Sequence, residues 1–130
     1  MKSLLVMILV TVMLGSLALS AAEKPNTVIH VVTLKWKDGV TDAQIKQALT
    51  TLEKVAASYP GITRLWLRSV KVQGAPIGEC AACKQPTHAF VMEFANEAAL
   101  TKYAGSDAQK EFYKVYLPLR DESRTHDITN

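Results

Sequence analysis

The 130-residue sequence lacks the features that mark several specialised classes of protein. It has no internal repeat, no low-complexity tract and no run of like charges after residue 22. The net charge is +3, and Lys2 supplies one positive charge to the N-terminal segment, so the rest of the chain carries +2. Scattered, nearly balanced charges of this kind favour a solvated surface. The sequence therefore predicts neither a nucleic acid nor an anionic membrane as a partner.

The first 22 residues have the organisation of a secretory signal peptide. A basic start at Met1–Ser3 precedes apolar residues 4–19, and Ser20-Ala21-Ala22 supplies small residues for cleavage. We expect cleavage after Ala22, which leaves one domain of residues 23–130 in the periplasm or outside the cell, with no membrane contact. The alternative is an uncleaved membrane anchor, because ~16 apolar residues approach the ~20 that span a bilayer.

Residues 23–130 alternate between strand and helix patterns. The first half is expected to contain strand 28–37, a helix with a capping box at Thr41 and Gln44 that ends at Pro60-Gly61, and strand 62–72. After loop 73–86, we expect strand 88–94 and then two short helices, capped by Asn96 and Asp107. The second short helix should end at Pro118, and strand 124–129 should follow it. The order β-α-β-β-α-β predicts an α+β, ferredoxin-like fold. In this fold, helices cover one face of a four-stranded antiparallel sheet.

Two of the expected strands each begin their more apolar face with a histidine. Successive strand side chains point to opposite faces, so the residues that share a face are His30, Val32, Leu34 and Trp36 in one strand, and His88, Phe90, Met92 and Phe94 in the other. If these strands pair, both imidazoles face one apolar space beneath the helices. We expect a small-molecule site there.

The opposite face of the expected sheet is also apolar. It carries Ile29, Val31, Thr33, Ala89 and Val91, which form too large an apolar patch to remain in water. A symmetric homodimer that packs sheet face against sheet face would bury them.

Several segments, taken together, resemble a known family. These are HVVTLKWKDGVT from His30, Tyr59-Pro60-Gly61, THAFVMEF, NEAALTKY and YLPL. Their order and spacing resemble the stress-responsive dimeric α/β-barrel (Dabb) proteins over about residues 28–129. The resemblance implies a ferredoxin-like monomer that dimerises through its sheet into an α/β barrel.

The resemblance implies less about activity, because most such proteins have none assigned. One plant member is a polyketide cyclase, and bacterial proteins of similar fold oxidise or rearrange aromatic polyketides without metal or flavin. Three polar residues of the cyclase pocket correspond to His30, His88 and Tyr103, but the helix histidine that is its general base corresponds to Gln109. An amide has no useful basicity near pH 7, although it can orient a ligand by hydrogen bonds. Cyclase activity is therefore not transferred to this chain.

We expect an exported protein that holds a small apolar or aromatic molecule between sheet and helices, without a cofactor. The candidate ligand-binding residues are His30, Leu49, Leu52, His88, Phe90, Tyr103, Gln109 and Phe112. One alternative is a cofactor-free enzyme in which His30, His88 and Tyr103 are catalytic. Another is a structural dimer whose pocket is filled and whose histidines belong to the core. A cavity of ~300 Å³ or more beside the histidines would favour binding, whereas room for less than a few waters would favour a structural role.

The chain's two cysteines, Cys80 and Cys83, fall in the expected loop 73–86. In an exported protein such a pair most often forms a disulfide. Redox catalysis and a metal site with His88 are the alternatives. No carboxylate stands at a ligand-like spacing from His30 and His88, so we expect no metal there.

Overall fold

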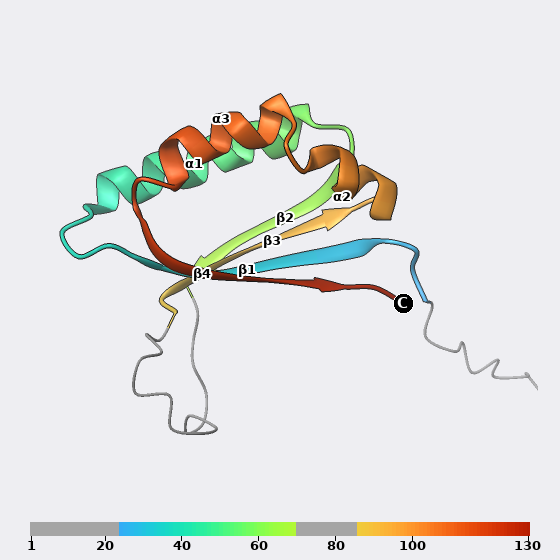
Figure 1. Cartoon of the computed structure of the whole chain (residues 1–130), viewed down its shortest axis with the longest axis horizontal. Coiled ribbons are helices and arrows are strands. Elements are labelled where there is room, and N and C mark those ends of the chain that lie inside the picture. Colours follow the sequence, from blue (N-terminus) through green and yellow to red (C-terminus); the bar gives the residue numbers. More distant parts are fainter. Residues whose placement is uncertain (1–23, 70–85) are drawn as a thin grey trace, which may run out of the picture.

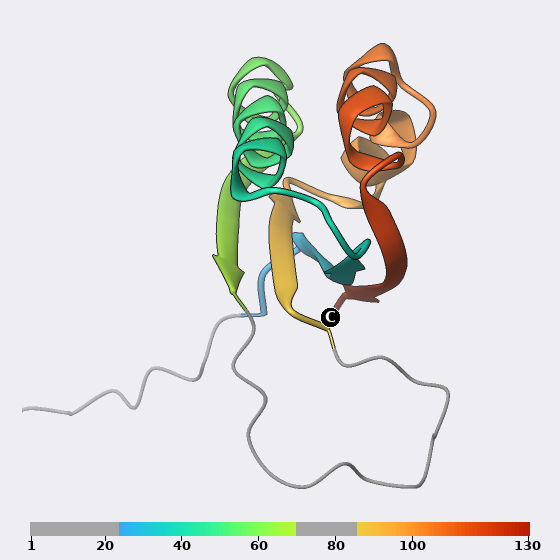
Figure 2. The same ribbon diagram turned by 90° about the vertical axis from the view of Figure 1, so that its left-hand side faces the viewer.

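The structure, a computed structural model that describes residues 24–69 and 86–130, has one layer of sheet and one of helices (Figures 1 and 2). The elements in chain order are β1 (Val28–Trp36), α1 (Asp42–Ser58), β2 (Ile62–Ser69), β3 (His88–Phe94), α2 (Glu97–Tyr103), α3 (Asp107–Tyr116) and β4 (Arg120–Ile128). This arrangement confirms the predicted ferredoxin-like fold. Figure 2 shows α1 over the β2 side of the sheet and α3 over the β4 side.

The sheet is antiparallel, with the order β2-β3-β1-β4. In the central pair, His30 lies opposite Met92, and Leu34 lies opposite His88. Directly paired residues point to the same face of a sheet, so both predicted apolar rows face the helices. The buried hydrophobic residues are Val28, Val32, Leu34, Trp36, Ala48, Leu52, Val55, Phe90, Met92, Phe94, Tyr103, Phe112 and Tyr116.

The helix starts agree with the sequence in one case and differ in another. Thr41 and Gln44 form the predicted capping box of α1, in which the Thr41 N–H donates to Gln44 Oε1 at 2.9 Å. The cap of α3 is Ser106 rather than the predicted Asp107. Ser106 Oγ accepts from the Gln109 N–H at 3.2 Å, which makes Asp107 the first helical residue. A carboxylate there still interacts favourably with the positive end of the helix dipole.

Strand β4 begins four residues earlier than predicted, at Arg120 rather than at residue 124. Its side chains are mostly polar on both faces, so the alternation that identifies a half-buried strand is absent. Pairing with β1 forms the strand instead, with Ile29 opposite Ile128 and Leu34 opposite Ser123. This longer strand supplies one wall of the site described below.

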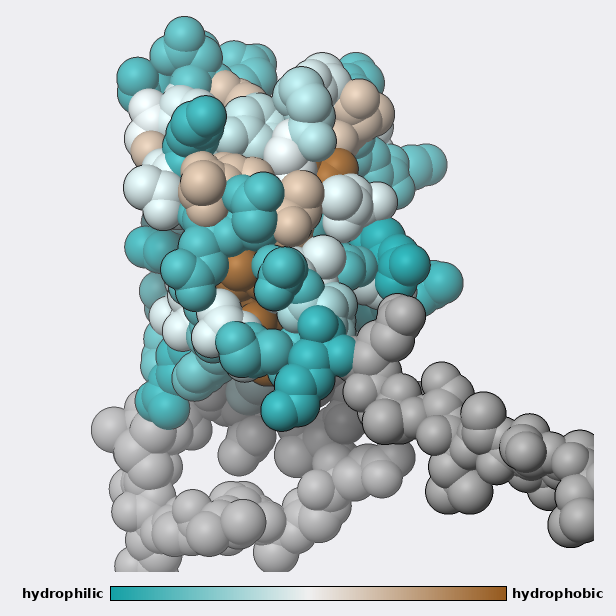
Figure 3. All heavy atoms as spheres, turned by 90° about the vertical axis from the view of Figure 1, so that its right-hand side faces the viewer, coloured by the Kyte–Doolittle hydropathy of each residue, from teal (hydrophilic) through white to brown (hydrophobic). Residues whose placement is uncertain are grey.

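Three predictions concern residues that the structure does not describe: the signal peptide, the end of the second strand after residue 69, and the loop with Cys80 and Cys83. Within the described ranges, no helix is long and apolar enough to cross a membrane. Figure 3 shows that hydrophilic residues cover most of one end of the molecule, with small hydrophobic areas between them.

Candidate functional site

A cavity of about 180 Å³ lies between the sheet and α3. Its walls come from β1, β3, β4, α2 and α3: His30, Val32, Phe90, Met92, Tyr103, Gln109, Phe112, Tyr113, Tyr116, Arg120, Ser123 and Thr125. The volume is close to the ~150 Å³ of an apolar cavity that accommodates benzene, and below the ~300 Å³ at which drug-sized sites begin. The cavity therefore has room for a molecule with one ring.

His30 is held at one end of the cavity by a carboxylate from β4. Its Nδ1 lies 2.6 Å from Oδ1 of Asp127, the residue directly opposite His30 in the pairing of β1 with β4. The ring of Phe94 meets the imidazole edge to face, with centroids 6.0 Å apart. With Nδ1 engaged by the carboxylate, Nε2 is the nitrogen left for a ligand or a proton. The side chain of His30 is 16% exposed and that of Asp127 45% exposed, so the pair is partly screened by solvent.

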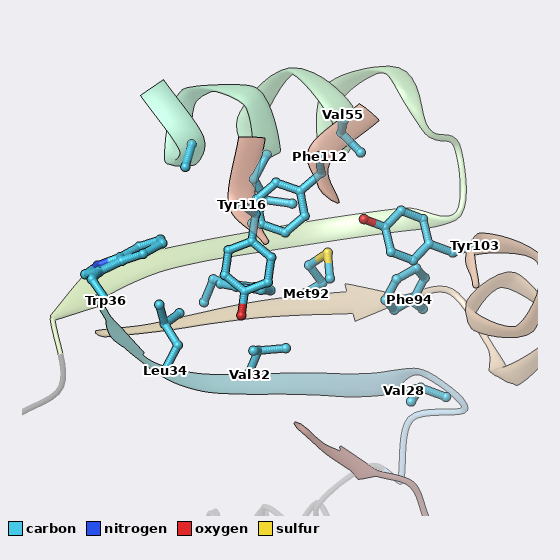
Figure 4. Packing of buried hydrophobic residues seen from close by; sticks show 13 residues of the cluster. Val28, Val32, Leu34, Trp36, Val55, Met92, Phe94, Tyr103, Phe112 and Tyr116 are labelled. Carbon is cyan, nitrogen blue, oxygen red and sulfur yellow. The ribbon is translucent and has the colours of Figure 1, made fainter. Parts of the chain in front are cut away.

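The Tyr103 hydroxyl in the cavity wall is buried without a hydrogen-bond partner among the described residues, whereas the Tyr116 hydroxyl is buried beside Ser123 and Arg120. Figure 4 shows Tyr116 reaching from α3 towards the sheet and Tyr103 pointing its hydroxyl into the core. Burial raises the pKa of Tyr103 far above its usual value. Burial also raises the pKa of Tyr116, although Ser123 and Arg120 oppose this shift. Both phenols therefore remain protonated near neutral pH and can donate to a bound molecule.

Arg120 carries the one permanent charge among the described residues that line the cavity. Its Nη1 donates to Ser123 Oγ at 3.0 Å, and its guanidinium carbon lies 5.8 Å from the centroid of the Tyr116 ring. Ser123 lies opposite Leu34 on β1, four residues along that strand from His30. At a strand rise of ~3.3 Å per residue these levels are ~13 Å apart. The cavity therefore has two separate polar ends with apolar residues between them.

Gln109 lines the cavity, but the oxygen of its side-chain amide already accepts a hydrogen bond. Its Oε1 accepts from the Gly105 N–H at 2.7 Å, while its own N–H donates to Ser106 Oγ. Gly105 has a φ of +77°, a left-handed conformation that glycine adopts without strain. The carbonyl oxygen of Gln109 thus secures the start of α3, and its Nε2 group is the part that can contact a ligand.

His88 lies away from the cavity, so the expectation that both imidazoles share one space is wrong. Its ring contacts Trp36, with centroids 5.7 Å apart, and its Nδ1 lies 3.0 Å from Thr87 Oγ1. Burial lowers the pKa of His88, and the carboxylate of Asp42 opposes that shift. His30 lies near the start of β1 and His88 starts β3, and antiparallel pairing places the starts of these two strands at opposite ends of the sheet.

The remaining candidates divide according to the helix that covers them. Phe90 and Phe112 line the cavity together with His30, Tyr103 and Gln109. Leu49 and Leu52 do not line it, because they belong to α1 and the cavity lies beneath α3. Leu52 is fully buried, and Leu49 packs against the core.

Sequence reasoning missed the wall contributed by β4, namely Arg120, Ser123 and Thr125, and the carboxylate of Asp127 that contacts His30. Asp127 lay in the predicted strand, but nothing in the sequence identified the residue that it would face. Among the described residues, no group of three or more His, Cys, Asp or Glu could hold a metal ion.

A larger surface groove of about 500 Å³ follows β2 and α1. Ala56 and Ala57 form its helix side, and Trp66 between Arg64 and Arg68 lies on its strand side. In the described part of the chain, no buried and unpartnered polar group lines this groove, whereas the Tyr103 hydroxyl lines the cavity. The cavity is therefore the stronger candidate for a small-molecule site.

The fold and the cavity define a ferredoxin-like α+β protein with a small site between sheet and helices. A profile of the Stress responsive A/B Barrel Domain family, Dabb, matches residues 28–130. The chain belongs to this family, which confirms the resemblance seen in the sequence. No curated protein matches the sequence.

Solved structures of similar fold include both uncharacterised proteins and enzymes. A dimeric ferredoxin-like protein of unknown function from Thermobifida fusca is 20% identical, with 82% of this chain and 92% of that chain covered and a TM-score of 0.62. A hydroxynitrile lyase from Passiflora edulis is 19% identical, with 80% and 93% covered and a TM-score of 0.64. The cofactor-independent oxygenase SnoaB from Streptomyces nogalater is 13% identical, with 81% and 93% covered and a TM-score of 0.59. At these identities, the similarity shows a shared fold.

Proposed function

We propose that this protein binds a small apolar or aromatic molecule in the cavity beneath α3. The observation that carries the proposal is the buried, unpartnered hydroxyl of Tyr103 in the wall of a cavity that fits one ring. A buried hydroxyl without a partner costs free energy, about 1–3 kcal/mol. A bound molecule with an acceptor atom would recover that cost.

The rest of the wall suits the body of such a molecule. Phe90, Met92 and Phe112 are almost fully buried, and Val32 completes an apolar middle section. Phe90 and Phe112 pack edge to face, with centroids 5.5 Å apart, which fixes the shape of the wall. Apolar walls with a few fixed polar groups are typical of small-molecule sites.

Catalysis is the second candidate, and the His30–Asp127 pair favours it. A carboxylate on Nδ1 orients an imidazole, so Nε2 could take a proton from a bound carbon acid. Tyr103 could then donate a hydrogen bond to the resulting oxyanion. Such a reaction would need no cofactor. We rank binding first, because Gln109 stands where the resembling cyclase has its base.

Binding is tested with phenol and 1-naphthol as probes, by ligand-observed NMR and calorimetry. We expect the one-ring probe to bind and the two-ring probe to bind much more weakly, because the cavity holds only about 180 Å³. Val32→Phe fills the cavity and should abolish phenol binding without lowering the melting temperature. Val115→Ile, on α3 but outside the cavity lining, is the matched control. Phenol binding that persists in Val32→Phe would place the site elsewhere.

Catalysis is tested separately, by turnover of a polyketide-like substrate. Activity that His30→Ala abolishes and Asp127→Asn lowers would make the protein an enzyme. In that case our ranking of binding above catalysis is wrong.

The proposed unit is a homodimer formed through the open face of the sheet. Val31 and Val91 lie opposite each other on this face, half-buried at its centre, while Trp66 and Ile128 on the edge strands are 42% and 57% exposed. An apolar centre of this kind is a common form of protein interface. Val31→Glu should place a charge in the contact and yield monomer or unfolded protein on size exclusion. A stable dimer in that variant would show that the sheets do not meet there.

Export rests on the N-terminal segment alone. We propose that the chain is cleaved after Ala22 and acts in the periplasm or outside the cell. Mass spectrometry of the protein from an extracytoplasmic fraction should give a mature N-terminus at Glu23. An intact N-terminus in a membrane fraction would favour the retained anchor.

A further inference from the structure

The polar end of the cavity at β4 has a composition that the proposed function does not explain. Three groups meet there: the Arg120 guanidinium, the Ser123 hydroxyl that it contacts at 3.0 Å, and the Tyr116 ring at 5.8 Å. No ion pair joins Arg120 to a carboxylate among the described residues, although this arginine is half-buried. A partly buried charge usually has a partner.

We infer that the ligand is a one-ring organic acid whose carboxylate binds to Arg120, Ser123 and Tyr116. This inference rests on the proposed function and names the class of molecule. A guanidinium offers two parallel N–H groups that match the two oxygens of a carboxylate. The two hydroxyls can contribute further donors to the same group. One guanidinium also balances one negative charge, which suits a carboxylate better than a dianionic phosphate.

The opposite end of the cavity extends the inference to the other end of the ligand. His30 and Tyr103 belong to that end, where the Phe94 ring contacts both of their rings, and the apolar residues lie between the two ends. A rigid acid with a ring in the middle and a hydroxyl opposite the carboxylate would contact both ends. 4-Hydroxybenzoate has this arrangement and fits the one-ring limit set by the cavity volume.

Calorimetry with three one-ring probes tests the inference: benzoate, its neutral isostere benzamide, and phenol. The variants are Arg120→Gln and, as a control of equal charge change, Lys114→Gln on the outer surface of α3, where the Lys114 side chain is 73% exposed. We expect benzoate affinity to fall ~10- to 100-fold in Arg120→Gln, as is typical when a charge-assisted hydrogen bond is lost. Benzamide and phenol carry no charge, so they should lose much less affinity than benzoate does in Arg120→Gln. Lys114→Gln should leave all three affinities unchanged.

The outcomes separate this inference from the proposed function. Unchanged phenol binding with no benzoate binding, or equal benzoate affinity in Arg120→Gln and the parent, would overturn the inference and leave the binding function intact. Failure of every probe to bind the parent protein would overturn both. Arg120→Lys keeps the positive charge but lacks the two parallel N–H groups of a guanidinium, so this variant should lose part of the benzoate affinity. Retained phenol binding in each variant shows that the cavity is still formed.

Discussion

Removing the hydroxyl of Tyr103 should stabilise the protein and weaken ligand binding at the same time. Tyr103 is 2% exposed, and its hydroxyl has no partner among the described residues. Its ring packs against Tyr59 and Phe94, with centroids 5.3 Å away in each case. Tyr103→Phe keeps those ring contacts and removes only the unpaired polar group. An unpaired buried hydroxyl costs about 1–3 kcal/mol, so we expect a gain of about 1 kcal/mol in the free energy of unfolding.

Tyr59→Phe is the matched control, because it should have the opposite effect. The Tyr59 hydroxyl donates to the carbonyl oxygen of Ala99 at 3.1 Å, a bond worth about 0.5–1.5 kcal/mol. The two variants delete the same atom from neighbouring rings, and their unfolding free energies should differ by about 2 kcal/mol. For a domain of about 100 residues, 1 kcal/mol corresponds to ~4 °C or more in melting temperature. The melting temperatures should therefore differ by at least ~8 °C.

The assay is thermal and urea unfolding of both variants and the parent, at one protein concentration, because a dimer's stability depends on concentration. Phenol binding is measured on the same samples, and Tyr103→Phe should bind phenol more weakly than Tyr59→Phe does. If Tyr103→Phe is destabilised as much as Tyr59→Phe, the Tyr103 hydroxyl has a partner in solution. The cavity would then offer no unpaired donor, contrary to our expectation.

Three further predictions concern His88, the cysteines and Gln109. Burial lowers the pKa of His88, so this imidazole binds a proton less readily in the folded protein than in the unfolded chain. The free energy of unfolding should therefore fall as the pH drops below about 6.5. His88→Asn should reduce this dependence on pH, as measured by urea unfolding. The exported protein should show no free thiol under denaturing conditions, and Cys80→Ser with Cys83→Ser should leave the fold intact; two titratable thiols or stoichiometric zinc would contradict this. Gln109→His should create weak proton transfer from an activated carbon acid near neutral pH, at a cost of about 1 kcal/mol for the lost contact with Gly105.

The sequence was sufficient for the fold because local signals and the periodicity of side chains agreed. The capping box at Thr41 and the alternation around Val32 and Phe90 each identified one element and its buried face. Strand β4 was the exception. Its polar residues on both faces gave no period-2 pattern, and pairing with β1 determines its start at Arg120.

The site was harder to predict, because a cavity depends on which strands are neighbours. From the sequence, His30 and His88 were equally good candidates for the small-molecule site, because each began the apolar face of a predicted strand. The antiparallel register separates them by four residue positions, and only His30 meets a carboxylate from β4. The chemistry therefore depends on a contact between residues 30 and 127, which no local pattern encodes. The same strand brings Arg120 to the cavity, so the part of the chain with the weakest sequence signal forms one polar end of the site and contacts His30 at the other.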